Sequence, residues 1–169
     1  SELYSQSYDP DFAIRGLHFD ERHGTLLKLD ELGMVQGDAI TFGRQRPSRT
    51  ECVRMYGEHG TWRVPHGERH RVRLLSDQFS IPEACLIADV IEFFVKQGHK
   101  TTISHKFIAE DVREAVSHCH LSGAMYRAVL AEPDRFILRD PHLKPMLQRL
   151  RRNGRNVFLL TNSPFWFVD

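Results

Sequence analysis

The sequence predicts an α+β domain followed by one strand of a Rossmann-like α/β sheet, and three observations predict this fold. Short apolar runs separated by polar, glycine-containing turns over residues 13–42 indicate β-hairpins. Residues 80–152 carry apolar side chains at helical spacing. Residues 156–160 follow a helix and a glycine turn and are almost entirely apolar, which is typical of a strand buried on both faces of a parallel sheet. We therefore expect an α+β region at 1–153 and a core strand at 154–169.

The composition is that of a globular protein that binds neither nucleic acid nor a membrane surface. The chain has 169 residues, of which 41% are hydrophobic and 27% charged, and its net charge is +1. Such a balance gives no basic excess for binding phosphate backbones or anionic lipid. Because the sequence also has no signal peptide and no apolar run of about 18 residues, we expect no membrane partner.

Cysteine usage favours a reducing compartment. The three cysteines, Cys52, Cys85 and Cys119, are odd in number and far apart, and no Cys-x-x-Cys pair is present. Neither a disulfide framework nor a cysteine zinc site is indicated. We expect a cytoplasmic protein.

The segment between the hairpins and the first helix shows little regular pattern. Residues 43–76 are rich in glycine, proline and arginine and have weak apolar periodicity. We predict a long irregular excursion here. Connections of that length inside a domain are usually functional.

Four helices are predicted in the second half of the chain. The clearest covers Ser80 to Gln97, with Ser80 as its N-cap and Gly98 as its stop. Further helices are expected at 107–121, 124–131 and 141–152. The last of these feeds the 156–160 strand, but no other run in the chain reads as a parallel neighbour for it. Together with the start at Ser1, this leads us to expect a fragment.

Thr161, Asn162 and Ser163 follow the predicted strand. Small hydroxyl and amide residues at the carboxyl end of such a strand can hold a phosphate or a carboxylate. The alternative is that Thr161 ends the strand and the next residues form a turn with Pro164. The residues alone leave both interpretations open.

Several longer segments resemble one family of phosphohydrolases. They are Ala13–Asp20 (AIRGLHFD), Gly24–Asp30 (GTLLKLD), Asp111–Val116 (DVREAV), Gly123 and Val157–Ser163 (VFLLTNS). In these the chain resembles the cytosolic purine 5′-nucleotidase family of the haloacid dehalogenase superfamily, and most of all its 5′-nucleotidase domain-containing members. The resemblance covers nearly the whole chain. It implies a cap domain plus one strand of the haloacid dehalogenase core.

The resemblance also implies a mechanism. Family enzymes form an aspartyl-phosphate on one aspartate, use a second aspartate as general acid and base, and require Mg²⁺. Thr161, with Asn162 beside it, matches the strand-end residue that binds the phosphoryl group, and Ser163 completes the substrate-binding turn. Asp9 and Asp11 do not match the nucleophile motif, because no apolar strand precedes them. The nucleophile and the metal ligands are therefore expected outside this chain, which should be inactive alone.

The implied substrate is a nucleoside monophosphate or another phosphomonoester, and a homo-oligomer is compatible with the resemblance. The alternative function is a non-catalytic binding or regulatory module derived from the same family. The two would be distinguished by an Asp-x-Asp-x-Thr motif elsewhere in the gene.

Two more residues are candidates for substrate contact. Arg113 matches a family arginine near the nucleotide, although a surface ion pair is an alternative role for a helical arginine. Phe42 could stack on a base or anchor a loop. Ser117 and Tyr126 depart from the purine enzyme, which has an acidic residue and a lysine there, so purine specificity is not implied. We expect no metal site, because His118 and His120 would point about 200° apart on a helix.

Overall fold

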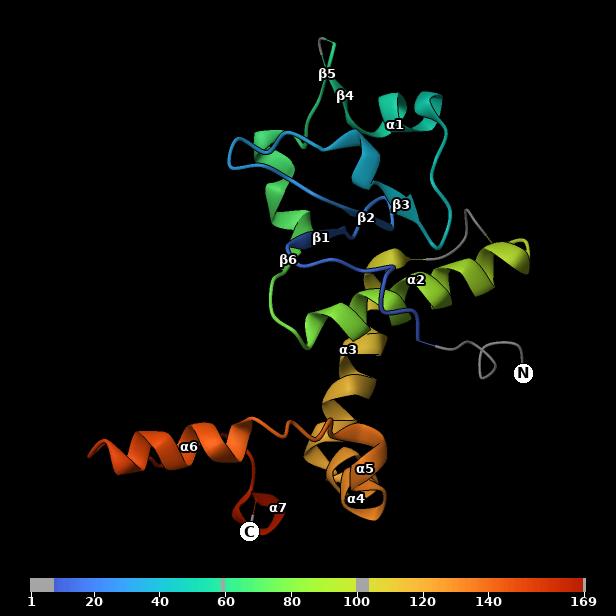
Figure 1. Ribbon diagram of the computed structural model, residues 1–169. Coiled ribbons are helices and arrows are strands. Elements are labelled where there is room, and N and C mark those ends of the chain that lie inside the picture. The colour runs from blue at the N-terminus through green and yellow to red at the C-terminus, as the bar shows by residue number, and fades with distance from the viewer. Residues whose placement is uncertain (1–7, 59, 100–103, 169) are drawn as a thin grey trace. The chain divides into compact units, whose positions relative to one another are not determined.

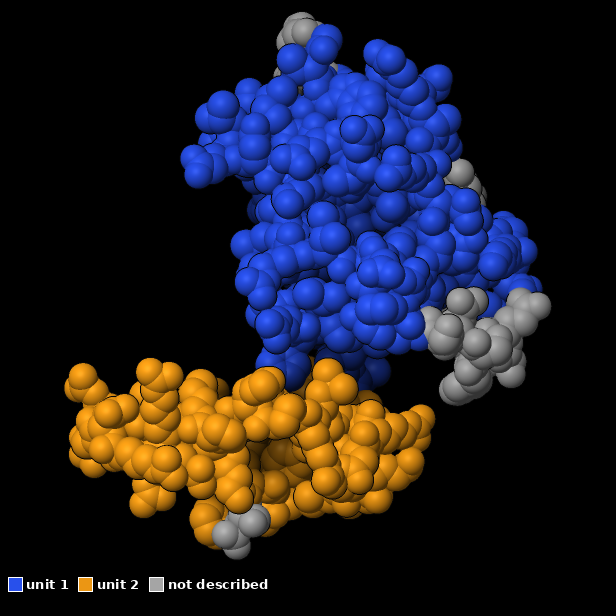
Figure 2. Space-filling model, viewed as in Figure 1, with its two compact units in different colours: residues 1–116 blue, residues 117–169 orange. Residues whose placement is uncertain are grey.

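The computed structural model describes residues 8–58, 60–99 and 104–168 and divides into two compact units, Ser1–Val116 and Ser117–Asp169. Figure 2 shows the two units in different colours. In the described part of the chain, no helix combines the length and the apolar character needed to cross a membrane. Each unit is described by itself.

The first unit is built on a four-stranded antiparallel sheet with strand order β3-β2-β1-β6 (Figure 1). The strands are β1 (Leu17–Asp20), β2 (Thr25–Leu27), β3 (Thr41–Phe42) and β6 (Val72–Leu75). The hairpins predicted over residues 13–42 are therefore confirmed for β1, β2 and β3. The fourth strand returns from far along the chain and pairs with β1 on its other side.

Helices α2 (Ser80–Lys96) and α3 (His105–Leu121) supply one of the two cores of this unit. Leu17 and Phe19 alternate along β1 toward this core, as the period of two in a strand requires. Ile87 and Ile91 of α2 pack against them. The predicted helix over Ser80–Gln97 and the predicted helix at 107–121 are both confirmed.

The N-cap of α2 differs from the prediction. Ser80 is already helical, and its backbone N–H donates to Oδ1 of Asp77 at 2.8 Å. The N-cap position predicted for Ser80 is occupied by Phe79, whose side chain makes no capping hydrogen bond, and Asp77 satisfies one of the free donors at the start of the helix. This hydrogen bond lowers the pKa of the Asp77 carboxyl, since it favours the charged form.

The second core of the unit lies on the other side of β2 and corrects another prediction. Residues 43–76 are not a long irregular excursion. They contain α1 (Arg49–Tyr56), β4 (Gly57–Glu58), β5 (Thr61–Trp62), the 3-10 helix η3 (His66–Arg71) and the strand β6. Cys52 and Tyr56 of α1 join Leu27 and Ile40 in a buried cluster, near the short 3-10 helix η2 (Gly37–Ala39). Tertiary burial makes these short elements stable although their sequence has little periodicity.

The second unit consists of short helices. They are α4 (Ala124–Ala131), α5 (Pro133–Phe136), α6 (Leu143–Arg152) and α7 (Phe165–Val168). The helix predicted at 124–131 is confirmed, and the one predicted at 141–152 begins two residues later than expected. Tyr126 of α4 contacts Phe167 of α7, with ring centroids 4.6 Å apart.

Residues 155–160 are irregular, which corrects the prediction of a strand at 156–160. The physical reason is that a parallel strand needs neighbours, and none of the described strands pairs with this segment. Its apolar side chains are exposed, up to 88% for Leu160. The domain boundary between residues 153 and 154 stays a prediction, as does the haloacid dehalogenase core.

Candidate functional site

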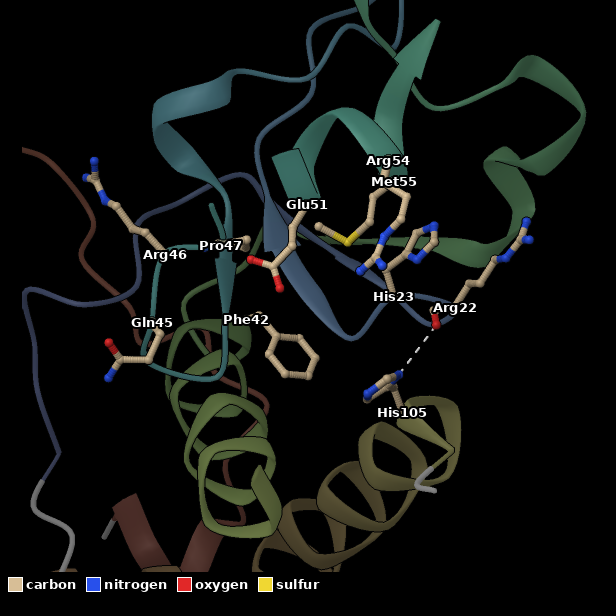
Figure 3. A pocket seen from close by; sticks show the side chains of 10 residues that line it. All are labelled: Arg22, His23, Phe42, Gln45, Arg46, Pro47, Glu51, Arg54, Met55 and His105. Atoms are coloured by element: carbon tan, nitrogen blue, oxygen red, sulfur yellow. Dashed lines mark hydrogen bonds between the residues drawn. The ribbon is translucent and has the colours of Figure 1, made fainter. Parts of the chain in front are cut away.

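The first unit contains a pocket with a volume of about 540 Å³, within the range of about 300–1,000 Å³ typical of small-molecule sites (Figure 3). Its walls come from three places in the sequence: the β1–β2 turn, the segment from β3 to α1, and the start of α3. The side chains fall into an aromatic and sulfur group, Phe42, Met55, His23 and His105, and a charged group, Arg22, Arg46, Arg54 and Glu51.

Phe42 and His105 face one another across the bottom of the pocket. Their ring centroids are 5.6 Å apart, and the rings are nearly perpendicular, at 85°. This edge-to-face arrangement is favourable for two rings. Figure 3 shows the Phe42 ring and the Met55 sulfur bordering the same space. The pocket therefore has an apolar wall able to contact a flat ring.

His105 is the first residue of α3 and is held against the β1–β2 turn. Its Nδ1 lies 3.4 Å from the carbonyl oxygen of Arg22. Its ring also packs on Gly24, where an added Cβ would lie 2.4 Å from the nearest ring carbon and where φ is +67°. Only glycine fits this turn without strain or displacement of the ring. Burial lowers the pKa of His105 and favours the neutral imidazole.

His23 forms the opposite side of the pocket. Its backbone N–H donates to Oδ1 of Asp20 at 3.3 Å. Its ring meets the Tyr56 ring edge to face, with centroids 5.5 Å apart. Burial lowers the pKa of His23, while the Asp20 carboxylate opposes this shift. Both pocket histidines are thus favoured in the neutral form, in which one ring nitrogen donates and the other accepts.

A buried polar network supports the His23 side of the pocket. The Asp20 carboxylate is fully buried and accepts a hydrogen bond from the Tyr56 hydroxyl at 2.9 Å. The Tyr56 oxygen lies 2.5 Å from the Thr25 hydroxyl, and Nε of Arg71 lies 3.2 Å from Oδ1 of Asp20. Burial, followed by the neighbouring Asp20 charge, raises the pKa of Tyr56, so its hydroxyl stays protonated and donates. A buried carboxylate with these partners is satisfied.

The charged side chains at the pocket differ in whether other residues already bind them and in whether they point toward the pocket space. Arg22 forms an ion pair with Glu68, with Nη1 and Oε1 3.1 Å apart. Glu51 is part of the capping box of α1, where its carboxylate accepts from the backbone N–H of Ser48 at 2.9 Å. In Figure 3, Arg54 extends toward His23 while Arg46 points away from the space. The pocket thus offers a cation beside an apolar wall, an arrangement suited to an anionic ligand with a flat ring.

The structure places the predicted substrate residues in different surroundings. Phe42 lines the pocket. Arg113 does not line it; its Nε lies 3.8 Å from Oε1 of Glu83, and its side chain is 46% exposed. The ion-pair role of Arg113 is therefore confirmed, with a partner on α2 rather than on its own helix. Substrate contact by Arg113 stays a prediction.

Thr161, Asn162 and Ser163 belong to the second unit. The backbone N–H of Ser163 donates to the Thr161 hydroxyl oxygen at 3.0 Å, so these residues form a turn. The turn follows irregular backbone rather than a strand. Its assignment to phosphate binding stays a prediction.

The sequence did not indicate His23, His105, Arg54 or Met55 as neighbours of Phe42. They meet only because β1, α1 and α3 converge, and no local motif reports such a long-range contact. The position of Gly24 in a turn next to His23 was the nearest signal. In the described ranges, no group of three or more His, Cys, Asp or Glu side chains could hold a metal ion.

Comparison with known sequences assigns the family. The 5′ nucleotidase family matches residues 1–169, the entire chain. The chain therefore belongs to the 5′ nucleotidase family, as the resemblance implied.

Similar proteins occur in distant organisms. A 5′-nucleotidase domain-containing protein of Dictyostelium discoideum is 36% identical over 162 residues, which cover 96% of this chain and 27% of that protein. The 5′-nucleotidase domain-containing protein 2 of Rattus norvegicus is 36% identical and that of Homo sapiens 34%, each over 169 residues. These matches also cover 96% of this chain, but 30% and 32% of the relatives. The chain thus spans about a third of the length of these relatives, or less.

Proposed function

We propose that the chain is part of a 5′-nucleotidase-like phosphohydrolase that acts on nucleoside monophosphates through an aspartyl-phosphate. Membership of the 5′ nucleotidase family is the observation that carries this proposal. Thr161 and Asn162 bind the phosphoryl group in it, and Ser163 and Arg113 contribute to substrate binding. Each of these groups is a neutral donor or a cation, which suits an anionic phosphate.

The Phe42 pocket receives the base in this proposal. A nucleobase is flat, has hydrogen-bonding groups at its edge and carries a phosphate through its ribose. Phe42 and Met55 offer apolar contact, and the neutral imidazoles of His23 and His105 each offer one donor and one acceptor. Arg54 adds a cation at the same space. These contacts do not select one nucleobase over another.

The described residues contain no group of three or more His, Cys, Asp or Glu side chains that could hold the Mg²⁺ of the family mechanism. We propose that the metal ligands and the nucleophilic aspartate belong to other parts of the polypeptide. When bound, Mg²⁺ would screen the charge of the phosphate. The residues of this chain bind and orient the substrate.

Catalysis therefore requires more than this chain. We expect that the purified chain, incubated with Mg²⁺ and a panel of nucleoside monophosphates, releases no phosphate above the buffer control. The reason is that charge stabilisation without a nucleophile cannot supply the chemical step. Colorimetric phosphate detection measures this. Turnover that depends on Thr161 would show instead that the catalytic groups lie within these residues.

Nucleotide binding by the pocket tests the proposal directly. We expect adenosine and guanosine 5′-monophosphate to bind the full chain and Phe42→Ala to weaken binding by about tenfold, the effect of losing one stacking contact. Isothermal titration calorimetry measures the dissociation constants. Phe136→Ala, at a half-exposed aromatic in the second unit, is the control and should leave them unchanged. Equal affinities for the Phe42→Ala and wild-type chains would remove the pocket from the substrate site.

A further inference from the structure

Phe42 is the first residue of a tight turn that ends at Gln45. The backbone N–H of Phe42 donates to the Gln45 carbonyl at 2.8 Å, and the Gln45 N–H donates back to the Phe42 carbonyl at 3.1 Å. Gly43, inside the turn, has φ of +57°, a conformation that favours glycine. The turn is thus closed at both ends. The turn therefore fixes the backbone of Phe42 and the direction of the Cα–Cβ bond that carries its ring.

Two carboxylates of α2, Asp89 and Glu92, contact this turn. Asp89 binds the Arg44 guanidinium in a two-pronged contact, with Oδ1 2.6 Å from Nε and Oδ2 2.9 Å from Nη2. Such a paired contact fixes both distance and plane. The Asp89 hydrogen bond raises the pKa of Arg44.

Glu92 holds the same turn one helical turn further along α2. Its Oε2 accepts the backbone N–H of Arg44 at 3.2 Å, and its Oε1 accepts the Gln45 amide at 3.4 Å. The side chain also packs on Gly43, where an added Cβ would lie 2.7 Å from Oε2. Asp89 and Glu92 lie three residues apart, so both face the turn from one side of α2.

The surroundings make these contacts strong. Asp89 is 7% exposed and Glu92 is 8% exposed. Buried charges of this kind cost solvation unless they are paired, so the ion pair and the hydrogen bonds oppose any movement of the turn. The Arg44 guanidinium also lies 4.0 Å from the centroid of the Phe12 ring, which covers it. Neither Asp89 nor Glu92 lines the pocket.

We propose that Asp89 and Glu92 are positioning residues that hold Phe42 in the orientation required for ligand binding, an inference that rests on the function proposed for the pocket. They act through the Arg44 turn and touch no ligand. A pocket wall placed on a loop is accurate only when a second layer of contacts fixes it. Here that layer consists of the two carboxylates of α2, Asp89 and Glu92.

The test uses Asp89→Asn and Glu92→Gln in the full chain, which keep the shape of each side chain and remove its charge. We expect each to weaken binding of guanosine 5′-monophosphate by about tenfold, the effect expected when the Phe42 ring no longer stacks on the base. Glu83→Gln is the matched control. Glu83 is equally buried on the same helix and pairs with Arg73 at 2.7 Å, but it does not touch the turn. Oε1 of Glu83 also lies 3.8 Å from Nε of Arg113, a proposed substrate-binding residue, so this variant is the control for the ligand-free readout below. It should lower stability and leave the orientation of Phe42 unchanged.

A second readout needs no ligand. Because Phe42 and His105 are in edge-to-face contact, the ring protons of His105 experience the ring current of Phe42. We expect the NMR resonances of His105, assigned with His105→Gln, to shift in Asp89→Asn and Glu92→Gln and to stay in place in Glu83→Gln. Circular dichroism establishes that each variant is folded.

The outcomes separate the two proposals. If wild-type chain binds no nucleotide but the His105 resonances still shift, the function proposed for the pocket is wrong and the positioning role is retained. If affinity and His105 resonances are both unchanged in the two variants, the positioning role is wrong. Equal shifts of the His105 resonances in Glu83→Gln also overturn it, because they would reflect general destabilisation. Should Asp89→Asn fail to fold, Glu92→Gln decides alone.

Discussion

Single side chains explain how the pocket keeps its shape, and His105 illustrates this best. It is a pocket wall, a contact of the Phe42 ring and a neighbour of the β1–β2 turn at the same time. The close packing on Gly24 leaves no room for a larger residue there. A change in the charge of one imidazole therefore affects several contacts at once.

The burial of His105 predicts how the free energy of unfolding depends on pH. An unfolded histidine has a pKa of about 6.5, whereas burial lowers the pKa of His105 in the folded chain. Between these two values the unfolded state binds more protons, so the free energy of unfolding falls as the pH decreases below about 6.5 and is fully regained above it. We expect this dependence in urea unfolding curves recorded between about pH 5 and about pH 8.

His105→Gln should flatten that pH dependence without abolishing it. His18 and His23 also have a pKa lowered by burial and contribute in the same direction. His118→Gln, at an exposed position of α3, is the control variant. An unaltered slope in His105→Gln would mean that protonation of His105 is not linked to folding.

At the scale of elements, what could be predicted from the sequence followed from burial pattern. Helix α2 was predictable because Ala84, Ile87, Ala88 and Ile91 recur at helical spacing and are all buried. Its N-cap was assigned to Ser80, whereas the helix already includes Ser80, the N-cap is Phe79, and the Asp77 carboxylate accepts the Ser80 N–H. Ser80 is a residue type that commonly caps helices, and only the backbone conformation shows where the helix begins.

Helix α1 was not predicted because it lacks the apolar stripe that identified α2. Its sequence, RTECVRMY, buries only Cys52 and Tyr56, so the sequence shows no apolar stripe at helical spacing. Its capping box, Ser48 with Glu51, was the available local signal. The same holds for the site: Phe42 was a candidate from its own chemistry, but His105 reaches it only through the packing of α3.

The segment after α6 gives the prediction at this scale. Residues 156–160 and 165–168 expose apolar side chains, among them Phe158 at 80% and Phe165 at 76%. Because contiguous exposed apolar surface promotes association, we expect the full chain to aggregate and the chain lacking residues 156–169 to be more soluble. Size-exclusion chromatography and far-UV circular dichroism compare the two.

The truncated chain should retain α2 and α3, whose buried residues lie in the core of the first unit. A full-length double variant, Phe158→Asp with Leu160→Asp, separates the effect of surface chemistry from that of chain length. It should be as soluble as the truncation. A monodisperse full chain together with an unfolded truncation would show that residues 156–169 belong to a self-sufficient core.

At the scale of the whole molecule, the family assignment and the fold give different kinds of information. Family membership rests on the entire chain, whereas the pocket is a property of the first unit alone. The mixed α+β character was predictable because hairpin patterns over residues 13–42 are followed by helical patterns over residues 80–152. The strand of a parallel core was not realised, because the sheet that would pair with it is not among the described strands.

The pairing of β1 with β6 has a consequence for how this protein can vary. The polypeptide leaves the sheet after β3 and returns at β6, so the segment between them, which contains α1 and the β4–β5 hairpin, is a connection whose two ends are anchored on the same sheet. The entropy of closing a loop rises only slowly with its length, by about 0.6 kcal/mol for each doubling. The tip of the β4–β5 hairpin, at Gly60, is therefore a place where evolution could insert residues at little thermodynamic cost. Such an insertion would leave the contacts between the Phe42 turn and the α2 carboxylates unchanged.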